Sequence, residues 1–372
     1  MFTSLDGNSS AFGAGIISAF NGGEFDAATF GLLAALPDAA AFQSATENLL
    51  PDVTNSASFQ VYETVNNVGR TVNRRILNTL DERQTADGGT GTEVGFANVD
   101  SGLWADASYR FADQSNTSSF GASTEYDADS FSFSLGYDRE FDGNTLLGVS
   151  GTYSNVSIDL AREAADDVDV DVFHLAVYGA KRIQQFSLSG QIGYSFGDVS
   201  AERTAISGPV TSDYDVDGFN AQFEASYDFL LRKDGYFAPL IGLRYSGISA
   251  EEYTETGGLG LTVDTADTNI VEFRAGAISG REFEFGDNGV LDTYARVAYV
   301  NTIGSNGSDL RANFGSQSVL LEGVDGSNDR VELSGGADFF SSGRFSIGAS
   351  IDSELANSYT SIGGSIRLKA LF

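Results

Sequence analysis

Cysteine is absent from the 372 residues of the chain, and histidine, tryptophan and methionine occur once each. Without cysteine the chain forms no disulfide, holds no metal through thiolates and has no cysteine nucleophile. The absence is typical of a chain that crosses an oxidising compartment, where free cysteines form stray disulfides.

Basic residues are scarce, because 21 lysines and arginines face 52 aspartates and glutamates, for a formal net charge of −31. Phosphate binding needs positive charge, so this balance argues against a nucleic-acid partner and against a polybasic membrane anchor. Long apolar runs are missing too, since no stretch approaches the roughly 18 apolar residues of a transmembrane helix.

The first residues, MFTSLDGNSSAFGAG, have neither a basic region nor a long apolar core. They are therefore not expected to form a secretory signal peptide. We expect either a cytoplasmic protein or the C-terminal part of a longer one.

Glycine (44), phenylalanine (28) and tyrosine (15) are abundant, and together they suit strands and turns. From Ser101 to the end, apolar residues recur at every second position, as in FSFSLGYD from Phe131 and FNAQFEASYDF from Phe219. This period predicts about twelve strands, each about twice as long as the five or six residues of a usual strand.

The connections between these strands alternate in length. Tight turns such as EFDGN and FSSGR alternate with longer polar links, among them ERTAISGPVTSD, EEYTETGGLGLTVDTAD and the residues around 302 to 328. Short turns at one end and long loops at the other are typical of an outer-membrane barrel, whereas a soluble sandwich has shorter strands. We therefore predict an all-β fold, a twelve-stranded antiparallel transmembrane β-barrel over residues 100–372.

A helical period precedes the barrel over residues 51–85. Its apolar positions are Phe59, Tyr62, Val65, Val72, Ile76 and Leu80. Arg70, Arg74 and Arg75 form a basic stretch in an otherwise acidic chain. About 30 helical residues span about 45 Å, enough to thread a barrel. Residues 1–50 contain short apolar clusters around Phe30 and Leu36 that predict brief helices.

In this order, the helix, the barrel and the terminal aromatic residue resemble the translocator domain of autotransporters, the type V secretion proteins of Gram-negative bacteria. The most specific stretches are GLWADASYRFADQ, FSLGYDREFDGNTLLGVSGTYS, FAPLIGLRYSGISAEEYTE and SIRLKALF, and the likeness covers about residues 26 to 372. The resemblance implies that residues 1–50 are the end of an exported passenger and that residues 51–85 span the pore. Residues 86–99 would then be a periplasmic connector to a monomeric barrel in the cell outer membrane.

The last strand ends on Phe372, with Leu368 and Ile366 on the same face. An aromatic ring suits the boundary between lipid and water. The resemblance implies that these three residues are the signal read by the barrel-assembly machinery, so that outer-membrane lipid, this machinery and the chain's own passenger are the expected partners.

Strand alternation predicts which charged side chains face the lumen. The expected set contains both signs and comprises Arg110, Glu224, Arg244, Glu272, Arg274, Arg296, Glu332 and Arg367, with Asp106, Asp138, Asp228 and Lys369 beside them. Two interpretations remain open and are compatible: the groups pair with one another in a hydrated lumen, or they hold a basic helix or an extended chain.

The sequence offers little for conventional catalysis. His174 alternates onto the lumen face of its strand, but no nucleophile elbow accompanies it. The acidic run EAADDVDVD lacks EF-hand spacing and is better explained as a solvated loop. We expect no cofactor, no metal site and no turnover of a small substrate.

The helix contains the pair Asn66–Asn67, which is similar to the junction of self-cleaving autotransporters. The resemblance implies that the Asn66 side chain attacks its own backbone carbonyl and that Asn67 begins the retained fragment, with lumen carboxylates such as Glu224 or Glu272 assisting. The following residues, VGRTVNRR, follow the family pattern only loosely. The alternative is that both asparagines are ordinary polar residues of a helix that only plugs the pore.

Two function classes remain at this point. The first is a secretion device that anchors and exports a passenger. The second is a porin-like channel closed by an N-terminal plug. A twelve-stranded barrel should leave room for about one helix, so the matching length of residues 51–85 favours the first.

Overall fold

The structure is a computed structural model, and it describes residues 7–22, 31–32, 35–38, 41, 45, 48–51, 56–81, 101–115, 125–141, 144–161, 166–205, 208–231, 235–258, 260–265, 267–285, 289–306, 309–314, 316–321, 329–341 and 345–371. The described helices include α1 (Gly7–Gly22) and α4 (Ser56–Asp81). Among the described residues, no helix is both long enough and apolar enough to cross a membrane. The expected connector, residues 86–99, lies outside the described residues.

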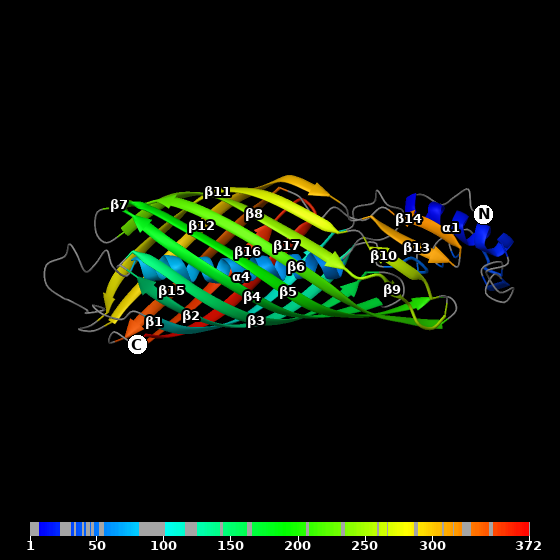
Figure 1. Cartoon of the computed structure of the whole chain (residues 1–372), viewed down its shortest axis with the longest axis horizontal. Coiled ribbons are helices and arrows are strands. Elements are labelled where there is room, and N and C mark those ends of the chain that lie inside the picture. The colour runs from blue at the N-terminus through cyan, green and yellow to red at the C-terminus, as the bar shows by residue number, and fades with distance from the viewer. Residues whose placement is uncertain are drawn as a thin grey trace.

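In the described part of the chain, twelve antiparallel strands close into a barrel (Figure 1). They are β1 (Ser101–Gln114), β2 (Tyr126–Phe141), β3 (Thr145–Leu160), β4 (Asp166–Ile183), β5 (Phe186–Ala205), β6 (Gly208–Tyr227), β8 (Gly235–Ala250), β11 (Thr268–Phe285), β12 (Gly289–Asn306), β15 (Arg330–Ser341), β16 (Phe345–Leu355) and β17 (Tyr359–Leu371). The short β7 (Phe229–Leu231) adds to β8. Pairing of β1 with β17 and of β8 with β11 completes the ring, which confirms the predicted fold. Closure leaves no unpaired strand edge in the hydrocarbon.

Both ends of the barrel sequence lie at the same rim. Gly102 pairs with Leu371, so the first and last strands meet where the short turns also lie. The strand ends that short links join, from β2 to β3, β4 to β5, β11 to β12 and β15 to β16, are at this end, marked by the C-terminus in Figure 1. The opposite rim carries the additional structure at the N-terminal end of the molecule.

The outward face of the barrel has an apolar zone nearer one rim and an acidic zone nearer the other. Nearer the short-turn rim lies an apolar belt, whose exposed side chains include Leu103, Leu135, Val149, Leu175, Ile192, Phe223, Ile241, Val297 and Ile366. Exposed aromatic residues border it on the long-loop side, among them Tyr109, Phe131, Tyr153, Phe173, Tyr194 and Tyr299. Apolar side chains flanked by aromatic girdles are the outer surface expected of a barrel in lipid.

Beyond the aromatic residues lies an acidic collar. We use this name for Asp113, Asp127, Asp129, Asp159, Asp167, Asp169, Asp171, Asp198, Glu202, Asp213 and Asp215, all of which are exposed. In one row of the sheet, Asp113 pairs with Asp127, Asp127 with Asp159, and Asp159 with Asp167. A band of exposed charges cannot lie in hydrocarbon, so the collar marks where the strands leave the membrane.

One predicted long link is wrong. The stretch ERTAISGPVTSD was expected to be a loop, but β5 continues to Ala205 and β6 begins at Gly208. The physical reason is that Ala205 and Val210 are buried in an apolar cluster beyond the barrel, which extends the two strands outward. With 20 residues, β5 rises roughly 66 Å, about twice the thickness of a bilayer core.

Two other expected loops form a second sheet. It comprises β14 (Gln317–Leu321), β13 (Leu310–Phe314), β10 (Thr262–Thr265) and β9 (Tyr253–Thr254), in that spatial order. Helix α1 packs against β13 and β14 at the N-terminal end of the molecule (Figure 1). We call α1 and this sheet the outer cap. The sequence predicted polar links here, and it did not predict a helix over residues 7–22.

Candidate functional site

Helix α4 lies inside the barrel, along its axis (Figure 1). Its 26 residues span about 39 Å, and it contacts β3, β4, β5, β6 and β8. The residues Val61, Val65, Val68, Val72 and Ile76 recur at helical spacing and are all buried. The lumen is therefore occupied by the basic helix that the sequence predicted before the barrel.

The wall meets the helix with apolar side chains at two levels. Near the outer cap, Val61 and Tyr62 belong to one cluster with Val156 and Ile158 of β3 and Val170 of β4. Nearer the short-turn rim, the helix residues Val68, Val72 and Ile76 cluster with the wall residues Trp104, Leu146 and Tyr178. These clusters also give the direction of the helix, since its N-terminal end lies toward the cap.

The arginines of the helix contact the wall. Arg70 pairs with Glu354 of β16, and its other partner is Glu63 on the helix itself, 3.9 Å away. Arg74 donates hydrogen bonds to Ser350 and to Ser365, the latter at 3.1 Å. The side chain of Arg75 lies outside the described residues.

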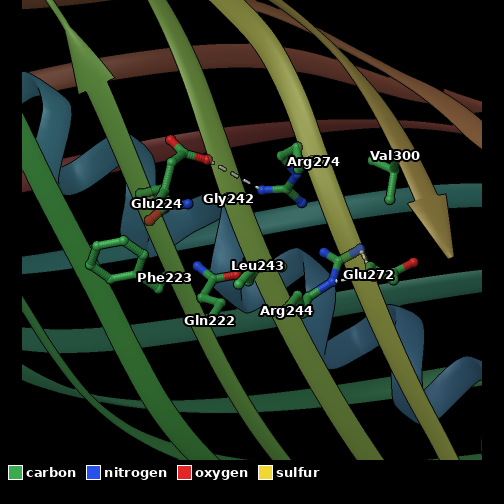
Figure 2. Close-up of a pocket in the computed structure, with 10 residues that line it drawn as sticks. Gln222, Phe223, Glu224, Gly242, Leu243, Arg244, Glu272, Arg274 and Val300 are labelled. Atoms are coloured by element: carbon green, nitrogen blue, oxygen red, sulfur yellow. Dashed lines mark hydrogen bonds and ion pairs between the residues drawn. The ribbon is translucent and has the colours of Figure 1, made fainter. Parts of the chain in front are cut away.

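A cluster of charged side chains surrounds Tyr62. Its hydroxyl donates to Glu272 Oε1 at 2.5 Å, and Arg330 Nη2 donates to the same hydroxyl at 3.1 Å. Glu272 also accepts from Arg244 at 2.5 Å and from Arg330. Figure 2 shows Arg244 and Glu272 facing each other from neighbouring strands. One helix residue is thus built into an ion network of the wall.

Neighbouring carboxylates of the barrel wall are also paired with arginines. Glu224 pairs with Arg296 at 2.5 Å and with Arg274 at 3.5 Å. Figure 2 shows the contact with Arg274. Glu332 lies 3.1 Å from Arg274 and 3.6 Å from Arg330. Burial of these charges is possible because each carboxylate has arginine partners.

A third group lies on β1, β15, β16 and β17. Arg110 pairs with Asp352 and donates to Ser361 at 2.8 Å. Arg367 lies 3.5 Å from both Asp106 and Asp338. The charged residues expected in the lumen have little exposed surface, and Arg296 is the most accessible, with 11% of its side chain exposed.

Sequence reasoning missed several members of this network. Arg330, Asp352 and Glu354 were not named, although Arg330 and Glu354 each bridge two clusters. Alternation supplied the signal, because Arg330 lies two residues before Glu332 on its strand. Glu63 was also missed, since a helix residue gives no indication of which wall it faces.

Little space remains between helix and wall at one level of the lumen. Beside Asn73, Gln222, Glu224 and Arg274, the cavity is only about 10 Å³, close to the minimum for one water molecule. Gln222 closes this region by donating to the Gly69 carbonyl at 3.3 Å. Around Gln222 and Gly69, the lumen is therefore packed with side chains.

Comparison with known proteins decides the family. The autotransporter β-domain model matches residues 103–352, more than half of the chain. The chain belongs to the autotransporter β-domain family. In fold, this autotransporter barrel is similar to the translocator domain of NalP from Neisseria meningitidis, with a TM-score of 0.59, 14% identity and coverage of 83% and 98% of the two chains. It is also similar to the β-domain of BrkA from Bordetella, with a TM-score of 0.56, 19% identity and coverage of 73% and 100%.

Among sequence relatives is a protein named extracellular serine protease from Serratia marcescens, 26% identical over 222 residues, which are 58% of this chain and 20% of that protein. The chain spans about a fifth of the length of the first curated relatives that it matches. Membership in the family places the barrel in the Gram-negative outer membrane and implies a covalently linked passenger. The short-turn rim is then periplasmic and the outer cap is extracellular.

Asn66 and Asn67, the pair expected from the sequence to be a junction, lie in the middle of α4. Asn66 is 1% exposed, and its Nδ2 donates to Glu63 Oε1 at 3.4 Å. Asn67 Nδ2 donates to Ser108 Oγ of β1 at 3.2 Å. The structure pairs Glu224 and Glu272 with arginines, so the carboxylate beside Asn66 is Glu63 and not either of the two expected from the sequence.

His174 lies in the barrel wall and is fully buried. Its Nδ1 shares a hydrogen bond with Ser195 Oγ at 2.7 Å, but its Nε2 meets no hydrogen-bonding group of the described residues. A catalytic triad would need a carboxylate at that second nitrogen. Within the described ranges, no group of three or more acidic or histidine side chains is placed to hold a metal ion.

Two of the three residues that were expected to form an assembly signal are described by the structure. Ile366 and Leu368 point outward from β17 and are 59% and 55% exposed, so they contribute to the apolar belt. Phe372 lies outside the described residues.

Proposed function

We propose that this barrel anchors the chain in the outer membrane and mediates export and surface display of a passenger attached upstream of α4. The observation that carries the proposal is the position of α4. Its N-terminal end faces the outer cap, and its C-terminal end faces the rim where β1 begins. A chain threaded in this way has everything upstream of the helix on the outer side of the membrane.

The contacts of α4 support a segment retained in the pore after transport. Arg70 and Tyr62 are integrated into wall networks through Glu354 and Glu272. Glu354 and Glu272 are buried with these partners, and a carboxylate buried there without a partner would destabilise the fold. The wall is therefore matched to this helix and not to open water.

A peptide tag fused before residue 1 and provided with a signal peptide tests export. Intact cells should expose the tag to added protease, whereas cells expressing the tag and residues 1–84 without the barrel should not. A tag that remains protected in cells with a folded barrel would contradict the proposal. Folding is checked separately by the gel shift between boiled and unboiled samples.

The second candidate, a porin-like channel, makes the opposite prediction about the helix. If α4 fills the pore, deletion of residues 1–84 should raise single-channel conductance in planar bilayers. If the chain is a channel, the intact protein should already conduct and the deletion should change little. The cavity of about 10 Å³ beside the helix favours the first outcome.

We further propose that the outward face of β17 is read by the barrel-assembly machinery. Ile366 and Leu368 are exposed on one face, in line with the expected terminal signal Phe372. Deleting Phe372 or replacing Leu368 with Gln should slow assembly, measured as the fraction of chains that resist unfolding before boiling. Leu355→Gln, on the outward face of neighbouring β16, is the matched control and should assemble at the normal rate.

We also propose a self-cleaving junction at Asn66 and Asn67. The hydrogen bond between Asn66 and Glu63 supports this proposal. In this step the Asn66 Nδ2 bonds to the Asn66 backbone carbonyl carbon, and the bond to the Asn67 nitrogen breaks. One Nδ2 proton passes, through the Glu63 carboxylate, to the departing Asn67 amine. The upstream fragment ends in a cyclic imide that water opens. Glu63 acts as the proton carrier because it is the carboxylate within reach.

Mass measurement of the barrel fragment tests this step. The precursor should yield a fragment that begins at Asn67, and Asn66→Ala should yield none. Asn73→Ala is a matched control, because Asn73 is another buried asparagine of α4. A precursor that stays intact, or an Asn66→Ala variant that is still cut, would leave α4 as a plug only.

A further inference from the structure

The outer cap is not needed to close the barrel, yet it has a buried apolar core of its own. From the upstream chain, Phe12, Ile16, Leu49 and Leu50 are fully buried in it. The surface that receives them consists of Ala205, Val210, Tyr253, Leu261, Val263, Leu310, Ala312, Val319 and Leu321, which we call the cap platform. All of the platform residues come from the barrel half of the sequence.

Polar contacts join the same two parts. Arg203 at the end of β5 donates to the backbone carbonyl of Asn48 at 2.9 Å. The same guanidinium is held by Glu255 through two bonds of 2.8 and 2.6 Å. Ser18 of α1 donates to Gln317 of β14 at 2.8 Å. Two bonds join the backbone of Thr211 and Thr256 at 2.9 and 2.7 Å and tie the platform to β6.

The upstream segment and the barrel are therefore connected twice. One connection is covalent and runs through α4. The other is the contact of α1, Leu49 and Leu50 with the cap platform, a cluster that contains no residue of α4 among those described. A fully buried apolar contact reinforced by charged hydrogen bonds is the composition of a stable protein interface.

We propose that the cap platform is a non-covalent anchor that holds residues 7–50, and whatever precedes them, on the barrel after the chain has been cut between Leu50 and α4. That the preceding part is an exported passenger rests on the proposed function, but the anchor itself does not. It also does not require cleavage at Asn66, since any cut downstream of Leu50 leaves the same contact.

A cut introduced on purpose tests the anchor. Residues 52–55 are replaced by the recognition site of a sequence-specific protease, and a tag is placed before residue 1. The full chain in outer membranes is digested to completion, as judged on a denaturing gel. The membranes are then sedimented, and the tag is measured in pellet and supernatant. We expect the tagged fragment to stay in the pellet.

Helix α1 provides a matched pair of variants, because Ala19 is fully buried and Ala14 is exposed. Ala19→Asp places a charge in the dry interface and should increase the released fraction by about tenfold or more, whereas Ala14→Asp should leave it unchanged. Release from the unmodified cap, or equal retention of both variants, would overturn the proposal.

Ile16→Ala gives a milder test in which the cap still folds. It should raise the rate of release after cutting without reaching the level of Ala19→Asp. The gel shift on boiling should be the same for all variants, because α1 packs against β13 and β14, which lie outside the sheet that closes the barrel. Loss of export with an intact anchor would contradict the proposed function and not this inference.

Discussion

The lumen and the acidic collar both carry many carboxylates, but the two regions accommodate them in opposite ways. In the lumen, Glu272 and Glu354 each contact two arginines. In the collar, Asp127 pairs in the sheet with Asp113 on one side and Asp159 on the other. Buried charges need partners because they have lost water, whereas exposed charges remain hydrated and tolerate like neighbours.

This difference explains how a chain with a net charge of −31 builds a charged interior. Its few arginines are concentrated where burial makes them necessary, and the excess of acid is left outside. Burial, together with the neighbouring carboxylates Asp159, Asp169 and Glu202, raises the pKa of Asp167 in the collar. The collar thus carries an electrostatic cost that the lumen avoids.

Removing a lumen carboxylate should have the largest effect. Glu272→Gln leaves Arg244 and Arg330 without their shared partner and should lower the free energy of unfolding by about 3–5 kcal/mol. The measurement is denaturant unfolding in detergent, followed by the fluorescence of Trp104, which is buried beside α4. The matched change in the collar, Asp129→Asn, should shift the free energy by less than about 0.5 kcal/mol. Equal losses would remove the distinction between the two regions.

The boundary between belt and collar can be tested on one face of one strand. Phe223 and Asp215 both point outward from β6, and Phe223 is 51% exposed in the apolar belt. Phe223→Arg should cost about 2–4 kcal/mol in lipid. Asp215→Arg should be neutral or slightly stabilising, because it adds a cation among carboxylates. The comparison is made by unfolding in lipid vesicles, and a comparable cost at both sites would mean that the collar lies in hydrocarbon.

The pH dependence should come from the collar. Burial and the neighbouring Asp113 raise the pKa of Asp127, and Asp167 is raised in the same way. The folded state then binds more protons than the unfolded state between the ordinary carboxyl pKa and the raised value. Stability should therefore rise modestly as pH falls through that window and decrease as pH rises through it. Unfolding midpoints between pH 7 and pH 4 should change less in the double variant Asp127→Asn, Asp167→Asn than in the original chain.

Salt should have the smallest effect. Like charges in the collar are exposed, and they are screened at a Debye length of about 8 Å at physiological ionic strength. Raising sodium chloride should stabilise the original chain slightly and the same double variant less. Destabilisation by salt would indicate that favourable surface ion pairs dominate instead.

Alternation made much of the fold and of the lumen predictable. A period of two gives the face of each residue directly, so the inward position of Glu224 and Arg367 followed from their strands. It does not give the partners across the lumen. Arg330 and Glu272 are 58 residues apart, and their meeting depends on how the strands are staggered around the barrel.

The outer cap was not predictable by the same reasoning. The sequence Ser207, Gly208 and Pro209 is typical of a turn, yet β6 begins at Gly208, because Val210 is buried in the cap. Likewise, α1 is largely small and apolar, and its position depends on contacts with strands about 300 residues away, such as that of Ser18 with Gln317 of β14. Local pattern contains no information on such contacts.

Disulfide trapping tests the central claim, that α4 occupies the lumen through contacts with the wall. The chain contains no cysteine, so an introduced pair has no competitors. Asn67 and Ser108 touch through a 3.2 Å hydrogen bond, and Tyr109 beside Ser108 faces outward. After mild oxidation in outer membranes, the pair Asn67→Cys and Ser108→Cys should cross-link nearly completely, while Asn67→Cys with Tyr109→Cys should not. A failure of the first pair to cross-link, or equal cross-linking of both pairs, would contradict a helix held in the lumen.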